Sequence, residues 1–444
     1  MSKSAQPLTD AIVAFAAARG KPLPESARHV MKLSLLDWCA VAIAGREEPV
    51  AGIVRSLVAE EGGLAEATVI GFAERLPARA AALANGSASH ALDYDDTHFA
   101  HIGHPSVAIV PAALAMAEKA GARGGEFLDA ALIGVEASCR IGTWLGRQHY
   151  QHGFHQTATA GAFGATMAAA RLLGLDAVAM AQALGIAATR ASGLKSQFGT
   201  MGKPYHAGMA AANGIEAALL ARAGFISRPD GLECEQGFAE THAGEGGDLA
   251  PIISGLGEIF WFETVQHKFH ACCHGTHAAI EALNVIRLEH HLKPEEIASA
   301  EVTTHPRWLK VCNIEKPTTG LEAKFSYRLT SAMALSGRDT GALTTYTDAL
   351  CAEPALAALR DRISVATDTG LKDTEAQVVV HLASGAELRA HHDLDRQIPA
   401  AAREAKIRAK ASALLGANKA DALWAVISEI DHQPVEALAR LLNA

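Results

Sequence analysis

The first half of the chain is a nearly continuous series of helical segments, and this pattern limits the possible folds more than any other feature. Residues 7–19 and 26–44 show helical periodicity. The segment from Pro105 to Ala120 begins with proline and is followed by Gly121, the usual start and stop signals of a helix. Because alanine costs least in a helix, we predict a large all-helical domain that includes the alanine-rich segments 158–173, 177–191 and 205–223.

The pattern changes between residues 226 and 262, where glycine and acidic residues cluster as they do in loops. Beyond this region, residues 272–290 have a helical pattern, whereas residues 297–305 and 363–367 have the pattern of strands. A hairpin is predicted for residues 376–391 around Ser384-Gly385. The predicted fold class is therefore mainly α: a helical domain (1–262), a smaller α+β domain (263–398), and C-terminal helices (399–444) that pack back on the helical domain.

Composition narrows the range of partners. The net charge is −9 and no Lys/Arg-rich run occurs, which argues against a nucleic-acid partner. The N-terminal segment lacks the pattern of a signal peptide, and the apolar stretch at residues 207–225 contains too many polar residues to span a membrane. The seven cysteines include no CxxC motif, which indicates reduced thiols. We therefore expect a cytoplasmic protein that binds a small molecule and neither a nucleic acid nor a membrane.

The densest group of ionisable residues lies between His90 and Ser106, and it includes Asp93, His98 and His104. An aspartate beside a histidine orients the ring and raises its basicity, as a general base or acid requires. One alternative is structural: the carboxylates cap helices and one histidine fills a polar pocket. A second alternative is a metal site, because aspartate and histidine are good ligands. No HExxH motif occurs in the chain, and we predict no metal.

Two further clusters precede helices that are expected to be buried. The first contains Tyr150, His155 and Thr157; the amides of the following helix can hold a carboxylate, and Thr157 can cap it. The second places Lys203 before Pro204, where a phosphate loop would need Ser or Thr, and this argues against nucleotide binding. A lysine at a helix start instead suits carboxylate binding or stabilisation of an enolate. The structural alternatives are a solvated loop with a capping threonine and an ordinary surface lysine.

The second half of the chain contributes two smaller groups. Lys268 precedes the adjacent thiols Cys272 and Cys273, whose geometry opposes a disulfide between them. Tyr327 begins a helix and is either a proton donor or a core residue. The chain contains no GxSxG, Walker or GxGxxG motif. The histidines, lysines, aspartates and tyrosines that remain suit proton transfer at a carbon next to a carboxylate, which needs a base and donors that hold charge on oxygen.

The order and spacing of several motifs resemble one known family. The resemblance begins at Lys32-Leu-Ser-Leu-Leu-Asp37 and covers nearly the whole chain. Its strongest parts are His90-Ala-Leu-Asp-Tyr-Asp-Asp-Thr97, His104-Pro-Ser106, Gly153-Phe-His155-Gln-Thr157, Lys203-Pro-Tyr-His206-Ala-Gly208 and Lys324-Phe-Ser326. In these motifs the chain resembles the MmgE/PrpD family, which includes 2-methylcitrate dehydratase, cis-aconitate decarboxylase and iminodisuccinate epimerase. Gln156 stands where family members often have proline, so the resemblance does not name the substrate.

The resemblance implies an enzyme that acts on a small polycarboxylate, forms a homodimer and needs no metal or organic cofactor. Carried over by position, it implies a pocket lined by Asp93 or one of its neighbours and by Thr97, His104, His155, Lys203, Lys268 and Tyr327. From the clusters themselves we add Tyr150 as a catalytic residue, and His98 and Thr157 as substrate-binding residues.

Three functions are compatible with these residues. The first is a lyase that dehydrates or decarboxylates a citrate- or aconitate-like acid. The second is an epimerase of an amino-dicarboxylate such as iminodisuccinate, which needs two proton carriers, for instance Tyr150 or His155 facing Lys203. The third is a non-catalytic protein that binds a small acid.

Overall fold

The computed structural model describes residues 7–443, which form two compact units. The first unit contains the described residues up to His267 together with residues 415–443, and the second contains residues 268–414. The chain therefore enters the second unit just after the loop-rich region. The segment 399–444, which the sequence analysis kept together, is divided between the two units.

The first unit is built from helices. They are α1 (Leu8–Ala17), α2 (Glu25–Gly45), α3 (Pro49–Glu61), α4 (Ala78–Ser89), α5 (Pro105–Ala120), α6 (Gly124–Gln151), α7 (Gln156–Leu172), α8 (Ala177–Arg190), α9 (Gly202–Arg222), α10 (Phe238–Ala243), α11 (Leu249–Ile253), α18 (Ala417–Ser428) and α19 (Val435–Asn443). The described residues before 225 form no strand, so the prediction of a large helical domain is confirmed.

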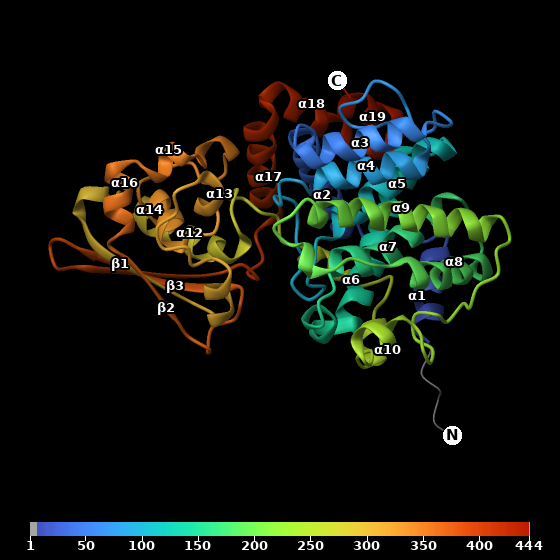
Figure 1. Ribbon diagram of the computed structural model, residues 1–444, viewed down its shortest axis with the longest axis horizontal. Helices are drawn as coiled ribbons and strands as arrows, with labels where there is room; N and C mark the ends of the chain where they lie inside the picture. The colour runs from blue at the N-terminus through green and yellow to red at the C-terminus, as the bar shows by residue number, and fades with distance from the viewer. Residues whose placement is uncertain (1–6, 444) are drawn as a thin grey trace. The chain divides into compact units, whose positions relative to one another are not determined.

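Helix α7 lies at the centre of this unit and packs against α5, α6 and α9 (Figure 1). Every residue from Gln156 to Ala170 is buried, so neighbouring helices must approach α7 from all sides. A Cβ atom at Gly164 would lie 2.5 Å from the carbonyl oxygen of Gly134 in α6. A Cβ atom at Gly208 in α9 would lie 2.2 Å from the carbonyl oxygen of Leu83 in α4. The alanine- and glycine-rich sequence is therefore what permits this close helix packing.

The last two helices return to the first unit, as predicted. Helix α18 packs against α2, and α19 packs against α5. Asp431 lies between them and forms ion pairs with Lys32, at 2.8 Å, and with Arg28 of α2. A Cβ atom at Gly124, where α6 begins, would lie 2.2 Å from the carbonyl oxygen of Ile430. The C-terminal segment is thus part of the helical core.

The second unit combines helices with one sheet. Its strands are β1 (Ile297–Thr304), β2 (Ile363–Thr367), β3 (Glu375–Leu382) and β4 (Glu387–Asp393), in the order β2-β1-β3-β4. Strands β1 and β2 are parallel, and the other pairs are antiparallel. Its helices are α12 (His277–Glu289), α13 (Gly320–Ala323), α14 (Tyr327–Leu335), α15 (Asp348–Cys351), α16 (Pro354–Arg360) and α17 (Ala400–Leu415), whose last residue lies past the unit boundary.

Helices cover one face of this sheet (Figure 1). Helix α12 packs against β3 and β4, and α14 packs against β2. Alternate residues of β3, namely Ala376, Val378 and Val380, are buried, as the period of a half-covered strand requires. Val302 of β1 pairs with Val378 and with Val365 of β2, which fixes the register. The predicted α+β unit and its hairpin are therefore confirmed.

The structure differs from the predicted helix over residues 272–290. Helix α12 begins only at His277. The N–H of Ala271 donates to the carbonyl of Thr340 at 2.8 Å, and the N–H of Cys273 donates to the carbonyl of Lys324 at 2.9 Å. These contacts between distant parts of the chain replace the first helical turn. Of the helices described, none combines the length and apolar character needed to cross a membrane.

Candidate active site

Three helices of the first unit begin at residues that the sequence analysis selected. His104 is the N-cap of α5, His155 is the N-cap of α7, and Lys203 lies in the first turn of α9. These three helices pack against one another. Unpaired N–H groups and the positive end of the helix dipole make a helix start favourable for an anion. The arrangement therefore suits a substrate that carries carboxylates.

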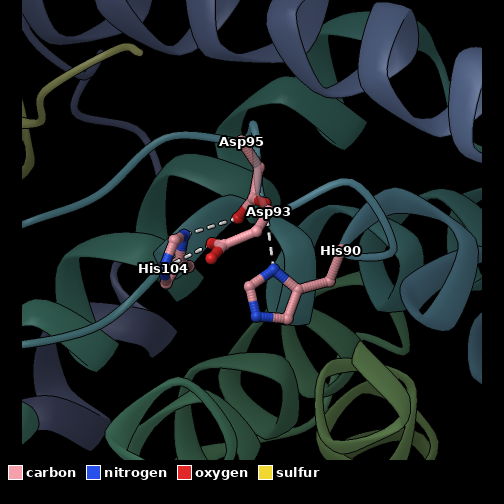
Figure 2. Close-up of side chains that lie close together, drawn as sticks. All are labelled: His90, Asp93, Asp95 and His104. Carbon is pink, nitrogen blue, oxygen red and sulfur yellow. Dashed lines mark hydrogen bonds and ion pairs between the residues drawn. The ribbon is translucent and has the colours of Figure 1, made fainter. Parts of the chain in front are cut away.

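A buried aspartate, Asp95, holds two histidines (Figure 2). One of its oxygens lies 2.9 Å from Nδ1 of His90, and the other lies 2.7 Å from Nδ1 of His104. Burial opposes the charge on Asp95, but His90 and His104 hold its pKa well below the usual range. Asp95 is thus ionised, and an ionised carboxylate only accepts hydrogen bonds, so each Nδ1 carries the proton that faces it.

Asp93 and Lys203 form the more exposed half of the site. The Nζ atom of Lys203 lies 2.7 Å from Oδ2 of Asp93, and Oδ1 of Asp93 lies 3.6 Å from Nε2 of His104. Asp93 has a φ of 50°, in the left-handed region that aspartate tolerates better than most residues. This turn directs Asp93 toward Lys203 and His104, whereas Asp95, two residues later, points to the interior.

His155 lies beside this group and is also buried. Its Nδ1 lies 3.2 Å from Nδ1 of His206, and its ring stacks on His90 with 5.9 Å between ring centroids. Burial, and then the charges of His90 and Lys203, lower the pKa of His155 well below its usual value. Burial likewise lowers the pKa of His206 to about 4. Both imidazoles are therefore neutral near pH 7 and able to accept a proton.

Asp96 has the opposite environment from its neighbour Asp95. It accepts hydrogen bonds from the Ser106 hydroxyl at 2.5 Å and from the Ser106 N–H at 3.3 Å. Burial, assisted by the charges of Asp37 and Asp95, raises the pKa of Asp96 to about 7. Asp96 therefore contacts Ser106 in the first turn of α5, and its burial opposes its charge.

Two predicted binding residues support the loop that carries His104. The Thr157 side-chain oxygen accepts a hydrogen bond from the His104 N–H at 3.0 Å. His98 donates from Nε2 to the carbonyl of Trp261 at 2.9 Å and accepts the His101 N–H at Nδ1, at 3.1 Å. Both side chains are buried, and both ring nitrogens of His98 have protein partners. These contacts position the loop and leave His98 no ring nitrogen for a substrate.

Thr97 and Tyr150 are partly exposed. The backbone of Thr97 exchanges two hydrogen bonds with Gln266, at 2.8 and 2.7 Å. Lys195 donates to the carbonyl of Tyr150 at 3.0 Å, and its Nζ lies 3.6 Å from the centre of the tyrosine ring. A cation over an aromatic ring is held by the negative ring face, so Lys195 fixes the ring of Tyr150.

Lys268 and Tyr327 belong to the second unit. Both side chains are buried there. The Tyr327 hydroxyl donates to the carbonyl of Gly275 at 2.6 Å and lies 3.0 Å from the hydroxyl of Thr304. Its burial raises the pKa of Tyr327 well above the usual value. Tyr327 thus ties α14 to β1 and to the segment before α12 within its own unit.

The cluster also has the composition of a metal site. His90, Asp93, Asp95 and His104 each offer one ligand atom within 4.8 Å of the others. In the structure these atoms contact one another, and the ammonium group of Lys203 compensates the charge of Asp93. These two histidines and two carboxylates could bind a divalent cation. The contacts that they make with one another and with Lys203 also suit proton transfer.

The sequence analysis gave His90 no role and included Asp95 only as a neighbour of Asp93. It assigned the orientation of a histidine to Asp93, whereas the structure gives the shorter histidine contact to Asp95. The three aspartates of this motif are equivalent by residue type. Only the left-handed turn at Asp93 decides which carboxylate points inward, and the residue pattern alone does not reveal that turn.

The chain is similar to known proteins over most of its length. Residues 11–248 match the MmgE/PrpD N-terminal domain, and residues 270–432 match the MmgE/PrpD C-terminal domain. A cis-aconitate decarboxylase of Aspergillus terreus is 32% identical over 276 residues, 59% of this chain and 56% of the relative. The human cis-aconitate decarboxylase is 31% identical over 274 residues, 59% of this chain and 56% of the relative. These matches span little more than half the length of the curated relatives. Because the two family domains together cover most of its residues, the chain belongs to the MmgE/PrpD family.

Proposed function

We propose that this chain is a lyase that acts on a small polycarboxylic acid by moving a proton at a carbon next to a carboxylate. One observation carries the proposal. His104 is held at Nδ1 by the buried Asp95, and its Nε2 faces the Asp93–Lys203 ion pair beside the starts of α5 and α9. A base positioned beside a cation and helix amides is what the removal or delivery of such a proton requires.

Each group has a role in this proposal. Lys203 binds a substrate carboxylate and stabilises the negative charge that develops on its oxygens. His104 exchanges the proton with carbon through Nε2. In a decarboxylation, the bond between carbon and the leaving carboxylate breaks, its electron pair stays on the substrate, and the imidazolium of His104 donates a proton to carbon. In a dehydration, neutral His104 removes the proton and the hydroxyl leaves as water after a second group protonates it.

Among lyase reactions we favour decarboxylation of an aconitate-like acid, because curated relatives of this chain are named cis-aconitate decarboxylases. An epimerase is the second candidate. It is supported by the proximity of His155 to Lys203, whose charge lowers the pKa of that histidine, because an epimerase needs two proton carriers. The basic groups His104, His155, Lys203 and Lys268 all occur in the chain, which argues against a purely binding role.

Proton NMR in deuterium oxide tests the proposal. Purified enzyme treated with a chelator would be incubated with citrate, 2-methylcitrate, cis-aconitate and iminodisuccinate. A new vinyl signal or released carbon dioxide would support the lyase and identify its substrate. Exchange of a proton next to a carboxylate without any vinyl product would support the epimerase. If none of the acids reacts or exchanges, the proposed function is wrong for these substrates.

The homodimer and the cytoplasmic location rest on the resemblance and on composition, and we retain both as proposals. Light scattering of the purified full chain would test the dimer, which is expected at twice the monomer mass of 46.4 kDa.

A further inference from the structure

We infer that Asp95 is a positioning residue that holds His104 in the reactive tautomer, and that His90 in turn holds Asp95. This inference deepens the proposed function, since it names the residues that prepare the proposed base. The sequence analysis assigned no role to either residue by number.

The four side chains lie close together (Figure 2) and differ in their exposure. The side chains of His90 and Asp95 are buried, with 0% and 1% of their surface exposed. In contrast, the side chains of His104 and Asp93 are 12% and 43% exposed. Asp95 contacts both imidazoles and uses one oxygen for each. Of the two histidines His104 is the more exposed, and its second ring nitrogen lies 3.6 Å from Asp93, so the interior members support His104.

The chemistry of the carboxylate sets the tautomers. Each Nδ1 that faces Asp95 must carry a proton, which leaves Nε2 of His104 as the nitrogen that exchanges a proton with the substrate. The negative charge of Asp95 also stabilises the imidazolium that forms when His104 takes this proton. A buried carboxylate needs compensation on both oxygens, and His90 supplies a donor for the oxygen that His104 does not use.

The ring of His90 is enclosed by other side chains. Its Nε2 is buried and has no hydrogen-bond partner. Its ring is packed between His104, at 4.6 Å between centroids, and His155, at 5.9 Å. Among residues 7–443, the polar contact of the His90 ring is therefore the one to Asp95 through Nδ1. What His90 contributes is a donor at a fixed place.

Asp95 and Asp96 provide a matched pair of variants, because they are adjacent and equally buried, but only Asp95 contacts histidines. Asp95→Asn keeps the shape but removes the charge, and its amide oxygen can accept from one imidazole only. We expect kcat to fall by roughly 10²- to 10⁴-fold with KM changed by less than about fivefold. Asp96→Asn is the control and should leave kcat within about threefold, since its partner is Ser106.

His90 is tested by rescue. The side-chain nitrogen of asparagine occupies nearly the position of Nδ1, so His90→Asn can still donate to Asp95, whereas His90→Leu fills the space without a donor. We expect His90→Asn to keep at least a tenth of the wild-type kcat and His90→Leu to lose about 10²-fold, with both variants melting cooperatively. Equal inactivity of the two variants would overturn the positioning role, because it would mean that His90 moves the proton itself. A loss below tenfold in Asp95→Asn would overturn it as well.

A measurement without substrate separates this inference from the proposed function. Nitrogen-15 NMR of histidine-labelled, full-length enzyme reports which ring nitrogen carries the proton. We expect the Nδ1–H tautomer for both His90 and His104 in the wild type, and one of the two to change tautomer in Asp95→Asn. An Nε2–H tautomer of His104 in the wild type would overturn the inference. If the tautomers are as expected but no acid reacts, the proposed function fails and the positioning of His104 stands.

Discussion

Lys203 places its Nζ atom 2.7 Å from Oδ2 of Asp93, and Asp93 reaches this position through a left-handed backbone with a φ of 50°. The pair is partly exposed, so its own contribution to stability is small. A substrate carboxylate can instead compete with Asp93 for the ammonium group. In the absence of substrate, the ion pair with Asp93 thus keeps Lys203 near His104.

Removing the charge of Lys203 should therefore impair turnover. In Lys203→Met the side chain keeps its length but no longer stabilises charge on the substrate, and we expect kcat/KM to fall by roughly 10²- to 10⁴-fold. The matched control is Lys119→Met, which removes an ion pair with Glu66 near the other end of α5, about 20 Å along the helix from His104. Steady-state kinetics on the substrate found by NMR checks both. A loss under tenfold in Lys203→Met contradicts the role proposed for this lysine.

The backbone at Asp93 allows activity and stability to be separated. A Cβ atom at a φ of 50° costs about 1 kcal/mol, while glycine adopts this conformation freely. We expect Asp93→Gly to melt at or above the wild-type temperature and Asp93→Ala to melt below Asp93→Gly, while both lose activity by about 10²-fold. Calorimetry and kinetics on the same preparations check this. Equal melting temperatures of the two variants would show that the turn carries no strain.

Much of the fold could be predicted because it depends on local signals. Pro105 and Gly121 mark the ends of α5 as the sequence predicts, and the alternation in residues 376–380 marks β3. The start of α12 could not be predicted, because the segment before it pairs with Lys324 and Thr340, far along the chain. Residues 272–276 therefore have a helical pattern in the sequence but form no α-helix in the structure.

In the candidate site, too, features that depend on local sequence could be predicted and those that depend on the fold could not. His104, His155 and Lys203 could be predicted, because basic residues next to a helix start have a recognisable local pattern. The role of Asp95 could not, because it depends on the turn at Asp93 and on which oxygen meets which imidazole. Residue type predicts the chemistry available, while the backbone decides which of several equivalent side chains is used.

The carboxyl group of Asp96 predicts how stability depends on pH. Its pKa is raised from 3.8 to about 7 on folding, so between these values the folded protein binds more protons than the unfolded chain. Stability should therefore fall as pH rises from about 4 to 7, by up to about 1 kcal/mol for each pH unit, and this loss should be complete above pH 7.

Asp96→Asn removes this titration and should flatten the fall of melting temperature across that window. The comparison variant is Asp230→Asn, since Asp230 is exposed and its pKa is lowered by the hydrogen bond from Arg228, so it cannot cause a fall in this direction. Calorimetry from pH 4.5 to 8 of the wild type and both variants measures the effect. An unchanged slope in Asp96→Asn contradicts the buried, protonated state of this carboxyl.

Helices α9 and α4 pack so closely that the protein needs glycine at position 208 for its stability. A Cβ atom at Gly208 would lie 2.2 Å from the carbonyl oxygen of Leu83 and 2.4 Å from the hydroxyl oxygen of Ser87, so the helices must separate in Gly208→Ala. We expect a loss of about 2–4 kcal/mol in the free energy of unfolding. Gly52→Ala in α3 is the matched control, because a Cβ atom there meets nothing within 4 Å and alanine is the better helix former, by about 1 kcal/mol. Denaturant titration should thus show opposite signs for the same chemical change, and a stabilised Gly208→Ala would mean that the two helices do not approach as closely as described.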